Sequence, residues 1–322
     1  MTNLREGLMD IRYFEPLSRA YKRMKVALFK PFDLRKWFVV GFTAFLAGLM
    51  DFEGGSGGGQ GKMGDGGWEE VLYFPRTVQQ WLTDNPQWFL LIAFGLVLVL
   101  ILVVVFTWLS SRGKFMFLDN VVHDLAQVAK PWYEFKSEAF SLFLWRIGIG
   151  FLVLAAVIPY LAYCYTTLVS VYEQEWDATA LIFPFVTMML GLIAVFAFFK
   201  YVNLLLVDFV VPLMYRSRIK VLAGWGAFLP LFGKHLLSFI GYGLFILVLK
   251  IAVGIGIVVV GLFTCCIGFI LMVIPYIGSV VLLPVSYTFR ALSVEFLEQY
   301  GPECQFFPRI DPDKLVRESP AS

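Results

Sequence analysis

The strongest constraint in this sequence is a set of apolar runs long enough to cross a lipid bilayer. The clearest lies between about Gln87 and Leu109, and its centre, residues 98–106, consists entirely of Leu, Ile, Val and Phe. A transmembrane helix needs about 20 mainly apolar residues. Charged residues make up only 16% of the chain, which is too few to cover a soluble surface of this size. The sequence therefore predicts an all-α, polytopic transmembrane helical bundle.

We expect about six spans, and the sixth is the least regular. Their approximate positions are 37–50, 87–109, 143–168, 181–200, 237–263 and a last apolar stretch interrupted by Pro275, Gly278 and Pro284. Proline removes a helical hydrogen bond, so the sixth span should kink or break. Whether it is a broken span or a re-entrant segment stays open.

The spans divide the chain into three parts. Residues 1–36 mix nine Lys and Arg with apolar residues and are typical of a cytoplasmic amphipathic segment. Residues 37–298 form the transmembrane domain, which includes a Gly-rich external loop at 51–86. Residues 299–322 are polar and contain four prolines, so we expect a loose tail.

Charge asymmetry predicts the orientation. The segments 51–86 and 169–179 carry two basic residues against nine acidic residues, whereas the other connecting segments carry nearly all the Lys and Arg. Cytoplasmic segments of membrane proteins are enriched in Lys and Arg. We therefore expect a multi-pass protein of the bacterial cytoplasmic (inner) membrane, with both termini in the cytoplasm.

Two similar stretches, which we call the first elbow (111–142) and the second elbow (200–236), follow spans two and four. Asp119-Asn120-Val121-Val122 precedes Trp132 in the first, and Asp208-Phe209-Val210-Val211 precedes Trp225 in the second. Two crossings separate the copies, so they share one orientation. The pattern predicts a parallel span–elbow–span repeat with amphipathic elbows at the cytoplasmic interface.

The elbows supply one set of candidate site residues. Basic side chains beside tryptophan suit anionic lipid headgroups, although the same charges would also serve simply to enforce topology. The candidate headgroup contacts are Arg112, Lys114, Lys130, Lys136, Arg146, Arg216, Arg218 and Lys220.

Asp208 and Lys250 form a second candidate set, because each follows a run of apolar residues. Ionisable residues at membrane depth are costly and often functional, so we predict a buried ion pair. In the alternative interpretation, Asp208 lies at the interface and Lys250 extends its ammonium group to it.

No catalytic motif is present. The two histidines, His123 and His235, have no carboxylate or cysteine partners at metal-ligand spacing, and no HExxH, GxSxG, P-loop or GxGxxG pattern occurs. We expect no enzyme activity, no cofactor, no metal and no nucleic-acid partner.

Several segments resemble an uncharacterised family of bacterial polytopic membrane proteins, a domain of unknown function. They are residues 31–37, 111–119, 141–146, 274–278 and 299–303. The stretch from Asp208 to Trp225 is also distantly similar to the membrane domain of some glycerophosphodiester phosphodiesterases. The resemblance implies the architecture and a bacterial source, but no catalytic residues.

These observations favour a non-enzymatic inner-membrane protein that organises or senses lipid, or an accessory subunit of a membrane complex. Membrane lipids are the expected partners, with another membrane protein as a second kind of partner. The alternative is a small-solute or lipid transporter that uses the Asp208/Lys250 region. The sequence specifies neither a ligand nor an oligomeric state.

Overall fold

A computed structural model describes residues 12–51, 77–78, 80–173, 178–264, 268, 271–272, 274–301 and 304–307. Within these residues the chain is helical and forms no strand. The elements are α1 (Phe14–Phe29), α2 (Leu34–Gly48), α4 (Pro86–His123), α5 (Ala129–Glu134), α6 (Lys136–Glu173), α7 (Ala178–Leu205), the π-helical turn η1 (Leu206–Val210), α8 (Val211–Ser217), α9 (Val221–Lys234), α10 (Leu236–Phe263), α12 (Pro275–Val281), α13 (Leu283–Leu297) and the 3-10 turn η2 (Glu298–Tyr300).

The helices belong to two compact units. Unit 1 comprises residues 1–48, 110–142 and 204–322, and unit 2 comprises residues 49–109 and 143–203. Each unit is therefore built from separate stretches of the chain. The predicted elbows fall mostly in unit 1, and the outer parts of the long apolar helices α4, α6 and α7 fall in unit 2.

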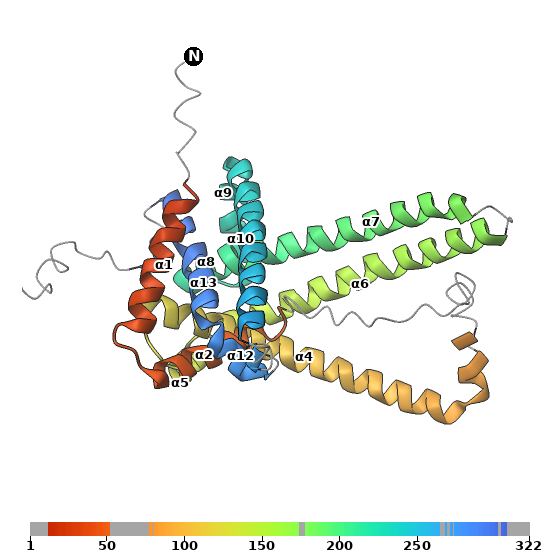
Figure 1. The fold of residues 1–322 in the computed structure, drawn as a ribbon, viewed down its shortest axis with the longest axis horizontal. Coiled ribbons are helices and arrows are strands. Elements are labelled where there is room, and N and C mark those ends of the chain that lie inside the picture. Colours follow the sequence, from red (N-terminus) through yellow and green to blue (C-terminus); the bar gives the residue numbers. More distant parts are fainter. Residues whose placement is uncertain are drawn as a thin grey trace, which may run out of the picture. The chain divides into compact units, whose positions relative to one another are not determined.

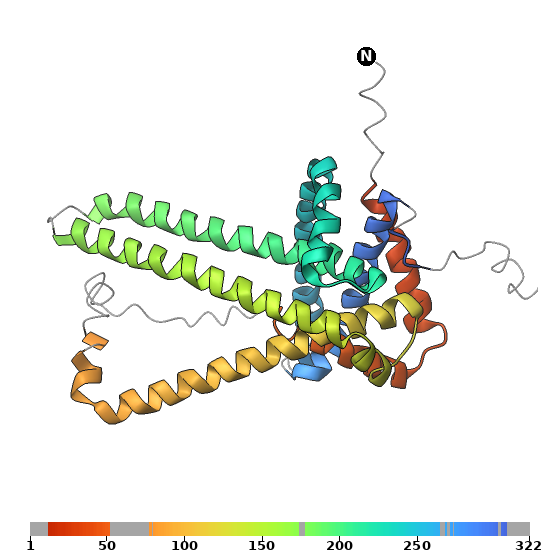
Figure 2. The same cartoon turned by 180° about the vertical axis from the view of Figure 1, so that it is seen from behind.

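Helix α13 is the centre of unit 1, because every residue from Arg290 to Leu297 is buried. Helix α1 packs along it more extensively than any other pair of described helices pack together, and the two lie side by side in both views (Figures 1 and 2). The inner stripe of α1, which is Pro16, Ala20, Met24 and Ala27, is buried and recurs at helical spacing. One face of the predicted amphipathic segment is therefore a protein contact.

Helix α2 runs antiparallel to the last part of α4. Ser110 Oγ donates to Ala47 O at 2.9 Å, Asn120 Nδ2 donates to Thr43 Oγ1 at 3.3 Å, and all four residues are buried. Gly113 allows the close approach, because a Cβ there would lie 2.5 Å from the carbonyl carbon of Leu46. Small and hydroxyl-bearing residues are typical of close helix pairs in membrane proteins.

Unit 2 contains an antiparallel pair formed by α6 and α7, which run together in Figures 1 and 2. Tyr160 of α6 donates its hydroxyl to the carbonyl oxygen of Met188 at 3.0 Å. Apart from a few such contacts, the side chains of this unit are exposed and apolar. Exposed apolar surface on this scale is what a helix in contact with lipid presents.

Among the residues that the structure describes, four helices are long and apolar enough to cross a membrane, or five if a bent pair is counted as one span. The four are Pro86–His123, Lys136–Ser170, Ile182–Ser217 and Leu236–Phe263. This supports a multi-pass membrane protein, but the predicted count of about six is not confirmed. The predicted first span corresponds to α2, whose 15 residues extend only about 22 Å, less than the ~30 Å hydrocarbon core.

The predicted break in the sixth span is present. Helices α12 and α13 meet at an angle of 65°, with Pro275 at the start of the first and Pro284 at the start of the second. Proline fits the first turn of a helix, where its missing N–H needs no partner. The sequence thus ends one helix and begins another here.

One contact bears on the predicted sidedness. Arg146 NH2 lies 3.3 Å from Asp51 Oδ1, although Asp51 was assigned to the external loop and Arg146 to the cytoplasmic end of span three. The contact brings these two residues together, and the orientation of the chain remains a prediction. Most of the Gly-rich loop, residues 52–76, and the tail from 308 onward lie outside the described residues.

Candidate functional site

The two elbows are joined to each other, and we call this contact the elbow junction. Tyr215 of α8 donates its hydroxyl to Asp119 Oδ1 of α4 at 2.6 Å, and His123 Nδ1 lies 3.1 Å from the same oxygen. The Tyr215 ring stacks on Phe135 with centroids 4.8 Å apart. Asp119, Phe135 and Tyr215 are buried, so the junction is part of the core of unit 1.

Arg218 completes the elbow junction. Its guanidinium pairs with Glu134, lies 3.8 Å from Glu138, and sits over the Phe135 ring at 3.9 Å. Nearby, the Val221 backbone N–H donates to Ser141 Oγ at 3.1 Å. One arginine of the second elbow therefore contacts three residues of the first, which makes Arg218 a structural connector.

The helix ends at the elbows share one backbone feature. Helix α4 ends before Asp124 and α8 ends before Arg218, and both residues have φ of 54°. Left-handed residues commonly end helices, and non-glycine residues occupy this region infrequently. The helices that come after these two ends differ in length, because α5 has 6 residues and α9 has 14. The parallel repeat remains a prediction.

Asp208 lies in the middle of η1 and belongs to a polar cluster. The Val211 N–H bonds to Leu206 O instead of Val207 O, as expected for a π-helical turn. Arg290 of α13 donates to the released Val207 carbonyl at 2.8 Å. Tyr242 of α10 donates its hydroxyl to Asp208 Oδ2 at 3.0 Å. The widened turn is thereby held by two neighbouring helices. This agrees with the rule that buried backbone groups find hydrogen-bond partners.

Lys250 is on α10, about two turns after Tyr242. Its ammonium group attracts the Asp208 carboxylate, as do Arg290, whose effect is largest, and Lys114. Asp208 therefore interacts electrostatically with three basic residues and accepts one hydrogen bond, from Tyr242. The prediction paired Asp208 with Lys250 and did not include Arg290 or Tyr242. The direct ion pair between Asp208 and Lys250 stays a prediction.

The candidate headgroup residues are placed in different environments. Lys130, Lys136, Arg216 and Lys220 are exposed, as the prediction requires. Arg218 is held in the elbow junction, and Arg112 lies 4.7 Å over the Trp132 ring and donates to its carbonyl. Arg146 is paired with Asp51. Lys114 has 1% of its surface exposed, so this side chain does not reach a headgroup.

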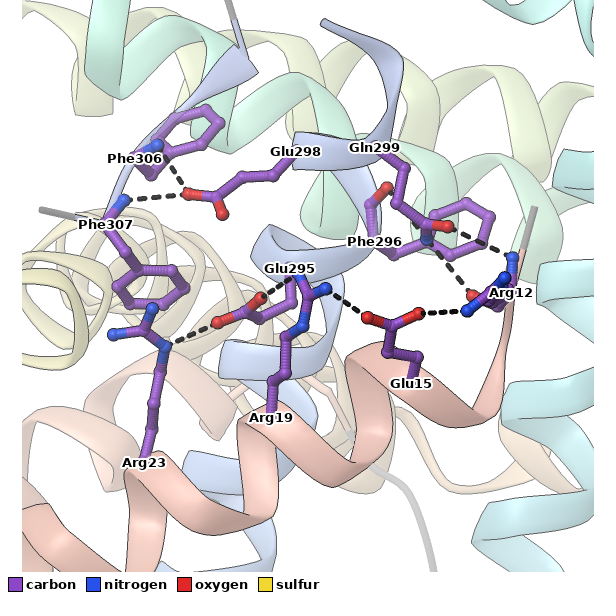
Figure 3. A network of polar contacts seen from close by, with 10 residues as sticks. All are labelled: Arg12, Glu15, Arg19, Arg23, Glu295, Phe296, Glu298, Gln299, Phe306 and Phe307. Atoms are coloured by element: carbon purple, nitrogen blue, oxygen red, sulfur yellow. Dashed lines mark hydrogen bonds and ion pairs between the residues drawn. The ribbon is translucent and has the colours of Figure 1, made fainter. Parts of the chain in front are cut away.

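A network between α1 and α13 lies outside every predicted site (Figure 3). Glu295 is 1% exposed and binds Arg23, with Arg19 3.8 Å away. On the surface, Arg19 also binds Glu15 and, together with Arg12, lowers the pKa of that carboxyl below its usual value. The sequence shows these arginines only as part of a basic N-terminal segment and does not identify Glu295 as their partner.

The same network continues into residues 304–307. Glu298 accepts the backbone N–H groups of Phe306 and Phe307 at 2.7 and 2.8 Å, and Arg23 lies 3.8 Å over the Phe307 ring. Residues near the start of the predicted loose tail are therefore fixed to α1 and η2.

A scan against protein families matches residues 12–297 to the family of unknown function DUF7544. The chain belongs to DUF7544. The DUF7544 match begins at Arg12, in the network described above, and ends at Leu297, the last residue of α13, so it covers both units. Searches of curated proteins and of solved structures found no match. Within the described part of this DUF7544 member, no group of three His, Cys, Asp or Glu residues could hold a metal ion.

Proposed function

We propose that this protein is a non-enzymatic membrane protein whose joined elbows bind anionic lipid headgroups, as an organiser of lipid or as an accessory subunit of a membrane complex. One observation supports this most directly. Lys130 and Lys136 of the first elbow and Arg216 and Lys220 of the second remain exposed, although the elbow junction uses Arg218. Each basic residue near an anionic leaflet adds about 1 kcal/mol of attraction.

The surroundings of these residues also support the proposal. Tyr133 is 73% exposed on α5, next to Trp132, and Leu222 and Leu229 are exposed on α9. Aromatic and aliphatic side chains beside lysine are typical of helices at a membrane interface. The junction fixes both elbows relative to each other, so the four charges would meet the leaflet as one set.

The proposal includes a location and a source. We place the protein in a bacterial cytoplasmic (inner) membrane with both termini in the cytoplasm, and the support is the Lys/Arg asymmetry of the connecting segments.

Native mass spectrometry of the purified protein in mild detergent tests the proposal. We compare the wild type with a variant in which Lys130, Lys136, Arg216 and Lys220 are alanine. The variant should lose most of its bound anionic lipid, because four attractions of about 1 kcal/mol are removed. The matched control exchanges Lys and Arg at the same positions, which keeps the charge. Unchanged lipid occupancy in the alanine variant would refute headgroup binding.

Transport by the Asp208 region is the second candidate. The observation in its favour is that Asp208 of η1 interacts electrostatically with Arg290 of α13 and Lys250 of α10, and that Arg290 is buried. Charged residues in such positions often mark substrate or ion pathways. Flux assays in proteoliposomes with Asp208→Asn test this. Loss of flux with retained lipid binding would favour transport.

A further inference from the structure

Helix α1 has a second stripe on its outer side, which is mainly aromatic. We define this outer face as Phe14, Tyr21, Lys25 and Phe29. These residues are exposed, with Phe14 at 76% and Tyr21 at 50%. They recur at intervals of seven, four and four residues, which places them on one side of a helix. The opposite stripe is already used against α13. On the outer face, Phe14 contacts the ring of Phe245 of α10 with centroids 5.5 Å apart, and the four residues nevertheless stay exposed.

The charge of this region restricts the partner. Residues 12–37 contain eight basic and two acidic residues. Arg12, Arg19 and Arg23 bind Glu15 and Glu295, as Figure 3 shows, and Lys36 binds Asp124.

The four remaining basic residues, Lys22, Lys25, Lys30 and Arg35, are exposed. None of them forms an ion pair with an acidic residue that the structure describes. They therefore contribute positive charge to a surface that also displays aromatic rings.

The aromatic residues extend beyond the helix end. Phe29, Phe32 and Trp37 form a cluster with centroids 5.5–6.5 Å apart, and Phe32 is 56% exposed. The Lys25 ammonium lies 5.4 Å from the Tyr21 ring. Lysines that extend past aromatic rings are characteristic of side chains at a lipid headgroup layer.

We propose that the outer face of α1, with the turn at Lys30–Arg35, lies on the surface of an anionic lipid leaflet. A second copy of the chain fits less well, because a symmetric contact would bring Lys22 and Lys25 of both copies together. The inference extends the proposed function to a separate surface, since α1 shares no residue with the elbows. It does not require the elbow charges to bind lipid.

A fluorescent probe on the full chain tests this proposal. Phe29→Cys is labelled with an environment-sensitive fluorophore after the four native cysteines are replaced, and the protein is placed in nanodiscs of phosphatidylcholine with or without phosphatidylglycerol. The emission should shift to the blue in the anionic nanodiscs, and brominated lipid should quench it. A probe that stays water-exposed and unquenched in anionic nanodiscs overturns the proposal.

Charge variants separate this surface from the elbows. Lys22→Gln with Lys25→Gln should lower the ratio of docked to undocked probe about 25-fold, at about fivefold per charge. Lys22→Arg with Lys25→Arg is the matched control and should leave the ratio unchanged.

A shielded probe that neither brominated lipid nor these variants affect would indicate a protein partner and would also overturn the proposal. The elbow alanine variant should leave the probe signal intact, so failure of the elbow proposal is distinguishable from failure of this one.

Discussion

Gly113→Ala is the sharpest test of how α2 packs on α4. A Cβ at position 113 would lie 2.5 Å from the carbonyl carbon of Leu46 and 2.7 Å from its Cβ. Carbon atoms normally lie at about 3.5–4.0 Å, so α2 would have to move by about 1 Å. The nearest atoms include backbone atoms of Leu46 and Ala47, and these cannot rotate away as a side chain could.

The expected cost follows from two opposing effects. Overpacking of a closely packed contact typically costs about 1–3 kcal/mol, while replacing a helical glycine by alanine gains about 0.5–1 kcal/mol. We therefore expect Gly113→Ala to destabilise unit 1 by about 1–2 kcal/mol. The movement of α2 would also lengthen the bond between Ser110 and Ala47 O.

The assay is thermal unfolding in one detergent, with Gly95→Ala as the matched control. Gly95 is in the same helix, and a Cβ there would meet nothing within 4 Å. The control should therefore be neutral or stabilising, whereas Gly113→Ala should lower the unfolding temperature by several degrees. Equal effects of the two substitutions would show that α2 does not pack against α4 at Gly113.

Three further predictions concern charge. Lys250→Ala should destabilise the protein by an amount that Asp208→Asn partly restores, as coupled residues do in a double-mutant cycle, and strictly additive losses would show independence. Glu295→Gln should lower the free energy of unfolding by about 3 kcal/mol, because it leaves a partly buried Arg23 without its carboxylate. Glu15→Gln should lower it by less than about 1 kcal/mol, because that pair is at the surface. Equal losses would contradict the importance of burial. A Gln60→Cys thiol should react with an impermeant reagent from outside the cell, and reaction from the cytoplasmic side alone would refute the proposed orientation.

The long helices were predictable because their signal is local. Runs such as 87–109 and 237–263 are apolar over more than 18 residues, and length with composition determines that they are helices able to cross a membrane. The break near Pro284 was predictable for the same reason, since proline acts on its own backbone. The predicted first span is not confirmed, because the 15 residues of α2 are few for a crossing and part of its apolar surface packs against α4 and α12.

The candidate sites were less predictable, because their partners are distant in the sequence. Arg23 and Glu295 are 272 residues apart, and nothing in either segment specifies the other. The sequence indicated Asp208 as a buried charge but not the π-helical turn that brings Arg290 to Val207 O. Burial of Lys114 depends on how the separate stretches of unit 1 pack together, which amphipathic patterning alone does not determine.

The contact between α1 and α13 also sets an order of events during synthesis. The inner stripe of α1, including Ala20 and Met24, is made before its partner α13, which follows about 270 residues later. At about 5–20 residues per second, the ribosome needs roughly 15–55 s to travel from one to the other. Over that interval the stripe has no native partner, so the nascent chain depends on the membrane or on a chaperone to cover it.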